Sequence, residues 1–163
     1  MSPCTLLRKN PTAVGFFFGA WPPFRDRYRN DVMSSFAIIV RGAPYSSQAA
    51  LSAWHFCTAV LAEGHSIQRL FFYEDGVLNA SAAIVPPQDE MHLPRAWQQL
   101  IQQNGIDAVV CVSSALKRGV VDASEAERYG LAAASLLPGF VIGGLGQLVE
   151  SCVQADRVIS FAA

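Results

Sequence analysis

The sequence predicts an α/β fold: one three-layer domain in which helices cover both faces of a parallel sheet. Strand-like and helix-like segments alternate from Ser35 to Phe161, and parallel neighbours need crossover helices between them. The first strand-like segment, residues 36–41, is a continuous apolar run, as expected of a strand that is covered on both faces, and the apolar run 107–112 also reads as a buried strand. These two observations together indicate a doubly covered parallel sheet.

The first half of the chain is expected to supply two strands and one helix. Residues 36–41 and 66–73 form the predicted strands. The helix between them starts at a capping Ser46 or Ser47 and runs to about Glu63. Its apolar positions recur at roughly helical spacing: Leu51, Trp54, Phe56, Val60 and Leu61.

The second half continues the alternation after a long loop that opens at Glu74. A short turn and helix are expected over 113–119, and 140–142 reads as a short irregular segment. The predicted regular elements are a helix over 93–104 that Gly105 ends, a strand over 109–112, a helical stretch from Asp122 or Ser124, a helix over 145–155 and a strand over 157–161. In such a sheet the loops after the first three strands gather at one edge, so we expect Tyr45, the loop 74–79 and Cys111 to lie near one another.

The composition points to an assembled, non-membrane protein. Apolar residues make up 52% and charged residues 15% of the chain, against about 25% charged in typical soluble domains. No apolar run reaches the roughly 20 residues that span a bilayer. A chain this poor in charge is expected to hide apolar surface against partner subunits; the alternative is a monomer with an unusually apolar core.

Residues 1–32 are interpreted as a non-domain extension, in keeping with a start codon assigned too early, and residues 33–163 as the domain. The alternative is a targeting or membrane-surface arm. The extension carries five basic and two acidic side chains, which leaves seven basic and eleven acidic for the domain. An acidic domain argues against a direct grip on nucleic acid, which depends on Lys and Arg that neutralise phosphates.

The cysteines are Cys4, Cys57, Cys111 and Cys152, and none forms a C-x-x-C pair. No Cys/His cluster has the spacing of a metal site, so no metal and no disulfide framework is expected. Cys57 and Cys152 fall inside predicted helices, where cysteine usually behaves as a small buried apolar residue.

Cys111 is the candidate reactive residue. It lies where a predicted strand hands over to a helix, which is where ligands bind in open α/β sheets. A helix start favours the thiolate, the nucleophilic form of cysteine. From position alone, the residue is equally well explained as core packing.

Other chemical signals are weaker. Lys117 and Arg118 follow Cys111 by about one turn, where they would stabilise its thiolate or dock an acidic partner. No histidine is placed beside Cys111 as a Cys–His hydrolase requires. The glycine-rich stretch 143–146 lacks a Walker lysine, which leaves close packing or a turn before a helix as its role.

Three separated motifs resemble the DsrE-like sulfurtransferases of the TusBCD sulfur-relay complex. They are the stretch 71–80 (FFYEDGVLNA), the stretch 95–100 (RAWQQL) and the stretch 111–122 (CVSSALKRGVVD). The glycines of 143–146 fit the family's C-terminal pattern, although a glycine at Gly143 often differs there. The likeness extends from Ser35 to Phe161, and residues 1–32 fall outside it.

The resemblance implies a DsrE-like, flavodoxin-like fold and a cytoplasmic persulfide relay without a cofactor. Cys111 would accept sulfur from a TusA-like donor and pass it to a TusE-like acceptor, for 2-thiolation of the wobble uridine of certain tRNAs. TusB-like and TusC-like subunits would complete a heterohexamer, a dimer of heterotrimers. Two alternatives stay open: a DsrE-type subunit of dissimilatory sulfur oxidation, and a scaffold subunit whose cysteine carries nothing.

Overall fold

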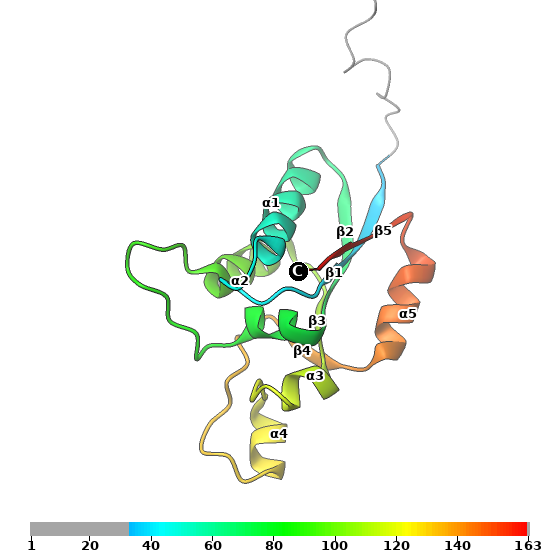
Figure 1. Cartoon of the computed structure of the whole chain (residues 1–163). Coiled ribbons are helices and arrows are strands. Elements are labelled where there is room, and N and C mark those ends of the chain that lie inside the picture. Colours follow the sequence, from blue (N-terminus) through cyan, green and yellow to red (C-terminus); the bar gives the residue numbers. More distant parts are fainter. Residues whose placement is uncertain (1–32, 163) are drawn as a thin grey trace, which may run out of the picture. The chain divides into compact units, whose positions relative to one another are not determined.

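A computed structural model describes residues 33–162, and the prediction for residues 1–32 lies outside the described residues. Eleven elements follow one another in the described part of the chain (Figure 1). They are β1 (Ser35–Val40), α1 (Ala49–Ala62), β2 (Ser66–Phe72), the 3₁₀ helix η1 (Glu74–Ala80), α2 (Leu93–Asn104), β3 (Ala108–Cys111), α3 (Val112–Leu116), α4 (Ala123–Arg128), β4 (Val141–Gly143), α5 (Leu145–Gln154) and β5 (Arg157–Phe161).

The strands form one five-stranded sheet in the order β4-β3-β2-β1-β5. Every neighbouring pair in the sheet is parallel. Helices α1 and α2 lie on one face and α5 lies on the other (Figure 1). The predicted three-layer parallel α/β architecture is confirmed.

The larger core fills the space between the sheet and the α1/α2 layer. Phe72 makes edge-to-face contacts there with Trp97 of α2 and with Phe140, at ring-centroid distances of 5.3 Å in both cases. Neighbouring Phe71 points to the opposite face because side chains alternate along a strand. Both faces of β2 are therefore buried at its carboxyl end, which explains the apolar run over residues 70–72.

Of the apolar positions that the sequence indicated for helix α1, only Val60 is among its buried residues. Its buried residues are Ala50, Ala53, Cys57 and Val60, and the larger side chains pack only partly against the core. Bulky sheet residues such as Phe36 and Ile38 fill this layer, so mostly small side chains fit opposite them. Gln48 precedes the first helical residue and makes no side-chain cap, while Ser47 Oγ accepts from the Ala49 N–H at 3.3 Å.

The prediction of a loop from Glu74 is wrong over its first part, which is η1. Gly76 lies so close to β1 that a side chain there would overlap the Val40 carbonyl. The buried Asn79 amide donates to the carbonyl oxygens of Gly42 (3.0 Å) and Gly76 (2.9 Å). These two residues hold the segment against the end of β1, which gives a structural reason for glycine and asparagine in the FFYEDGVLNA motif.

Two later elements show how far local sequence specified the fold. Helix α2 has the predicted bounds: Pro94 lies in its first turn and Gly105 ends it in the left-handed conformation, at φ 61°. The segment 140–142, predicted as irregular, contributes to β4, which pairs with β3. Three residues are too short a run for a strand pattern, and only the pairing with β3 establishes the strand.

Candidate functional site

Cys111 is the last residue of β3, and α3 begins at Val112, one residue before the predicted turn and helix. Its side chain points to the α5 face of the sheet, in a small cluster with Phe71 and Val109. Tyr73 and Leu148 pack against this cluster, and Cys111 is 2% exposed. The thiol of this single chain is thus covered by α5 and by the residue that follows β2.

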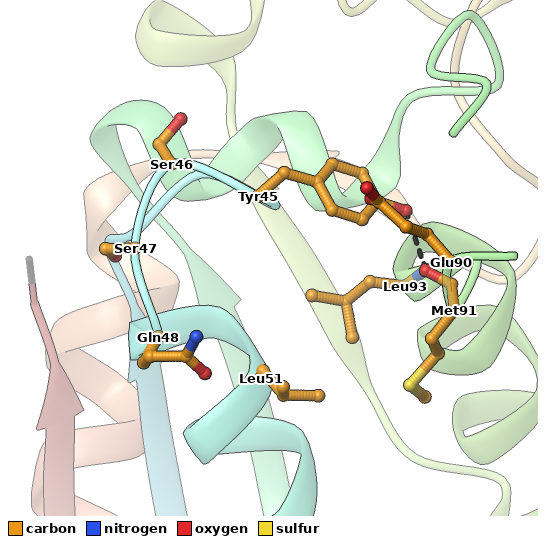
Figure 2. A pocket seen from close by; sticks show the side chains of 8 residues that line it. All are labelled: Tyr45, Ser46, Ser47, Gln48, Leu51, Glu90, Met91 and Leu93. Atoms are coloured by element: carbon orange, nitrogen blue, oxygen red, sulfur yellow. Dashed lines mark hydrogen bonds between the residues drawn. The ribbon is translucent and has the colours of Figure 1, made fainter. Parts of the chain in front are cut away.

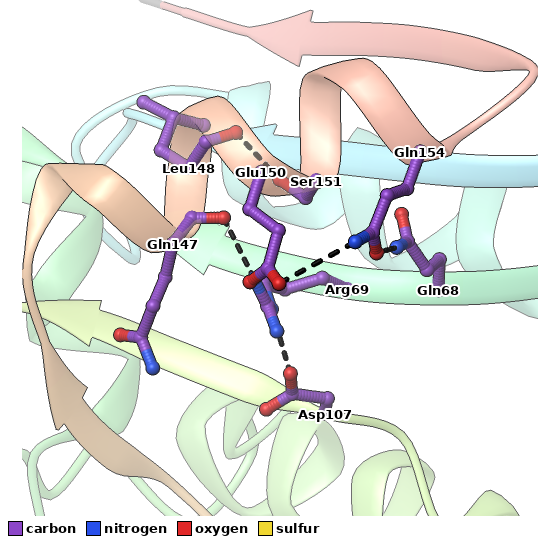
Figure 3. Close-up of polar contacts among 8 residues, drawn as sticks. All are labelled: Gln68, Arg69, Asp107, Gln147, Leu148, Glu150, Ser151 and Gln154. Atoms are coloured by element: carbon purple, nitrogen blue, oxygen red, sulfur yellow. Dashed lines mark hydrogen bonds and ion pairs between the residues drawn. The ribbon is translucent and has the colours of Figure 1, made fainter.

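Arg69 holds α5 over this cluster (Figure 3). Its guanidinium pairs with Asp107 before β3 (2.6 Å) and with Glu150 on α5 (2.9 Å). It also donates to the backbone carbonyl of Gln147 (2.7 Å). The Glu150 hydrogen bond is the largest of the influences that raise the pKa of Arg69. A cation that is always charged therefore ties the sheet to the helix that shields Cys111.

Segment η1 is joined to α3, directly after Cys111. The backbone N–H of Glu74 donates to Ser114 Oγ (3.2 Å), and Glu74 has a positive φ of 51°. Arg118 pairs with Asp75 (2.6 Å) and donates to the Ser114 carbonyl (3.2 Å). Arg118 therefore links η1 to α3, while Lys117 is exposed.

Tyr45, which we expected near Cys111, joins a different part of the chain. Its hydroxyl donates to the Met91 carbonyl (2.9 Å) and accepts from the Leu93 N–H (3.0 Å) at the start of α2. Tyr45 also lines a pocket of about 370 Å³ beside the start of α1 (Figure 2). None of the residues that line this pocket belongs to the cluster around Cys111.

The other two cysteines among the described residues differ sharply. Cys57 is fully buried under α1, as predicted, and desolvation raises the pKa of its thiol to about 12. Cys152 is exposed, so the prediction that it is buried is wrong. Helix α5 turns Leu148 and Ser151 toward the sheet, and Cys152 falls on its outer side with Val149 and Val153. The sequence indicated the helix but not which of its faces would meet the sheet.

No described histidine is placed as a base for Cys111. His55 belongs to α1, on the other face of the sheet. His65 accepts from the Ser34 N–H, beside the starts of β1 and β2, and His92 caps α2 by accepting from the Arg95 N–H. Within residues 33–162, no three His, Cys, Asp or Glu side chains gather as a metal site would require.

Sequence reasoning missed Gln147, whose side-chain oxygen is buried without a hydrogen-bond partner. The glycine-rich stretch before it was the available signal, because Gly143 leaves room for that side chain beside β3. None of the described helices is long and apolar enough to cross a membrane.

Three comparisons place the chain among known proteins. Residues 34–161 match the model of the DsrE/DsrF-like family. The chain is 50% identical to sulfurtransferase TusD of Erwinia tasmaniensis over 77% of its own length and 98% of the relative's. It is 46% identical to sulfurtransferase TusD of Serratia proteamaculans, over 79% of this chain and all of that protein.

The fold has a solved counterpart in the crystal structure of the ychN protein from E. coli. The two superpose with a TM-score of 0.64 at 21% identity, over 79% of this chain and 100% of the other. At that identity the likeness concerns the fold alone. On its sequence the chain belongs to the DsrE/DsrF-like family, and its likeness to the TusD relatives supports sulfurtransferase activity.

Proposed function

We propose that this chain is the sulfur-carrying subunit of a cytoplasmic sulfur relay and that Cys111 is the carrier. The observation behind it is a cysteine at the carboxyl end of β3, in a chain 50% identical to a sulfurtransferase TusD over most of its length. The donor is a TusA-like persulfide protein and the acceptor is a TusE-like protein. The sulfur ends in the 2-thio group of a tRNA wobble uridine.

The transfer consists of two thiol exchanges. The Cys111 thiolate attacks the outer sulfur of the donor persulfide; the donor S–S bond breaks, and the donor cysteine leaves as a thiolate. The acceptor thiolate then attacks the outer sulfur of Cys111–S–SH and releases the Cys111 thiolate. Sulfur–sulfur bonds form and break in equal number, so no oxidant is consumed. Such exchange depends on thiolate fraction and access rather than on a general base.

The burial of Cys111 suits a sulfur carrier, provided that its partners can uncover the thiol. A carried sulfur atom that is shielded by Tyr73 and Leu148 is protected from stray thiols, because thiol exchange requires access to the sulfur. Donor and acceptor must then displace this cover. We propose that they do so within an assembly that includes TusB-like and TusC-like subunits.

The charge of the domain supports protein partners over a direct RNA contact. Outside residues 1–32 the chain has seven basic and eleven acidic side chains, a poor basis for neutralising phosphates. The outer side of α5 carries Val149 and Val153, which are 62% and 79% exposed. Exposed valines beside one another on a helix are typical of surface that a subunit covers.

Mass spectrometry of this subunit tests the proposal, after the chain, assembled with TusB-like and TusC-like subunits, is incubated with a persulfide donor. All proteins carry Cys4→Ser and Cys152→Ser, because the exposed Cys152 would take up sulfur unselectively and Cys4 is a further thiol outside the domain. We expect the parent and its Cys57→Ser version to gain the mass of sulfur on Cys111, and its Cys111→Ser version to gain none. Loading that persists without Cys111 would overturn the assignment, and a parent that gains no sulfur would indicate a scaffold.

A further inference from the structure

Gln147 extends from the first turns of α5 toward β3 (Figure 3). Its backbone is fixed, because its carbonyl accepts a hydrogen bond of 2.7 Å from Arg69. Its side-chain Oε1 is buried and has no hydrogen-bond partner. A buried acceptor without a partner destabilises the folded protein, so it calls for an explanation.

Gly143 shows where this amide lies. A Cβ on Gly143 would overlap Gln147 Oε1 and would come within 2.6 Å of Val109 Cγ1. Gly143 is the register partner of Cys111 on the neighbouring strand, and adjacent strands are about 4.8 Å apart. Val109 and Cys111 point to the same face of β3. The amide thus occupies the space that a side chain at Gly143 would fill, on the face of the sheet to which Val109 and Cys111 point.

We propose that Gln147 is the polar contact for sulfur held at Cys111. Its Oε1, which has no partner in the structure, accepts from the outer S–H of a persulfide on Cys111, given the proposed function. The Gln147 NH₂ group donates to the ionised sulfur when the amide turns over, since one carboxamide offers both an acceptor and donors. Of the four other side chains in this cluster, Phe71, Val109 and Leu148 offer the sulfur no hydrogen bond, and Tyr73 carries a hydroxyl.

Replacing the amide by a carboxylate tests the contact. In Gln147→Glu a negative charge stands beside the sulfur and disfavours its thiolate. We expect the alkylation of Cys111 by iodoacetamide to become about tenfold slower at neutral pH, with its pH midpoint raised by about one unit. Gln147→Met keeps the side-chain length, lacks the amide, and is expected to slow alkylation by a smaller factor.

Gln154→Glu is the matched control, because it makes the same change on the same helix two turns away, where Gln154 bonds to Gln68. All proteins carry Cys4→Ser and Cys152→Ser, and Cys57 is suppressed by the raised pKa of its thiol. The titratable groups on the elements around Cys111 stay unchanged in every variant: Arg69, Tyr73, Glu74, Asp75, Asp107, Lys117, Arg118 and Glu150.

The inference is overturned if Gln147→Glu shifts the pH profile no more than Gln154→Glu does. The thiolate absorbance difference between each protein and its Cys111→Ser version gives the same titration where alkylation is slow. This experiment needs no sulfur donor. An unchanged profile in a chain that still loads sulfur refutes the role of Gln147 alone, whereas a shifted profile in a chain that loads none refutes the proposed function alone.

Discussion

Raising the pH from 8 to 11 should destabilise this protein through Cys57. Burial raises the pKa of its thiol from the ordinary value of 9.0 to about 12. Because the folded-state pKa lies above the unfolded one, the stabilisation is complete below pH 9 and is lost as the pH rises toward 12. At high pH the thiol of the unfolded chain has already lost its proton, and folding must take that proton up again.

The size of the effect follows from the shift. Each pH unit between the two pKa values costs about 1.4 kcal/mol of unfolding free energy. At pH 11, two units above the unfolded pKa of 9.0, the loss is about 3 kcal/mol. That is a large part of the 5–15 kcal/mol or so that stabilises a typical domain.

Urea unfolding isolates the contribution of the Cys57 thiol. The parent and Cys57→Ala are each unfolded at pH 8 and at pH 11 in reducing buffer. The alanine variant lacks the buried sulfur at both pH values, so its packing defect cancels when its two unfolding free energies are subtracted. The titration of every other group is common to both proteins and cancels when the parent and the variant are compared. The parent should lose about 3 kcal/mol more than the variant between the two pH values. Equal losses in both proteins would refute the reasoning.

Two further predictions concern the segment that the structure places against β1. Gly76→Ala puts a methyl group onto the Val40 carbonyl and should lower the free energy of unfolding by about 1–3 kcal/mol or more. The control is Gly146→Ala, where a Cβ meets nothing within 4 Å. Equal stability of the two variants in urea unfolding would contradict the prediction. Asn79→Leu removes both hydrogen bonds of the buried amide and should lower the free energy of unfolding by about 1–3 kcal/mol in the same assay. Wild-type stability of this variant would show that the two carbonyls find other donors.

The sequence by itself determined the elements whose signals are local. Apolar runs located β1, β2 and β3, and the run before Cys111 placed this cysteine at a strand end. Pro94 and Gly105 set both ends of α2, because each residue has a backbone preference that no distant contact is needed to express. The alternation of these elements was enough to predict the parallel sheet.

Only the tertiary structure decided what depends on contact between distant segments. Gly76 and Asn79 turn a predicted loop into η1 through contacts with the end of β1. The exposure of Cys152 depends on which face of α5 meets the sheet, and helical spacing alone does not choose that face. Gln147 reaches the face of the sheet that Cys111 shares only because β4 pairs with β3 and α5 folds back over both strands. Packing between elements depends on several distant residues at once, whereas a backbone preference belongs to a single residue and can be predicted from it.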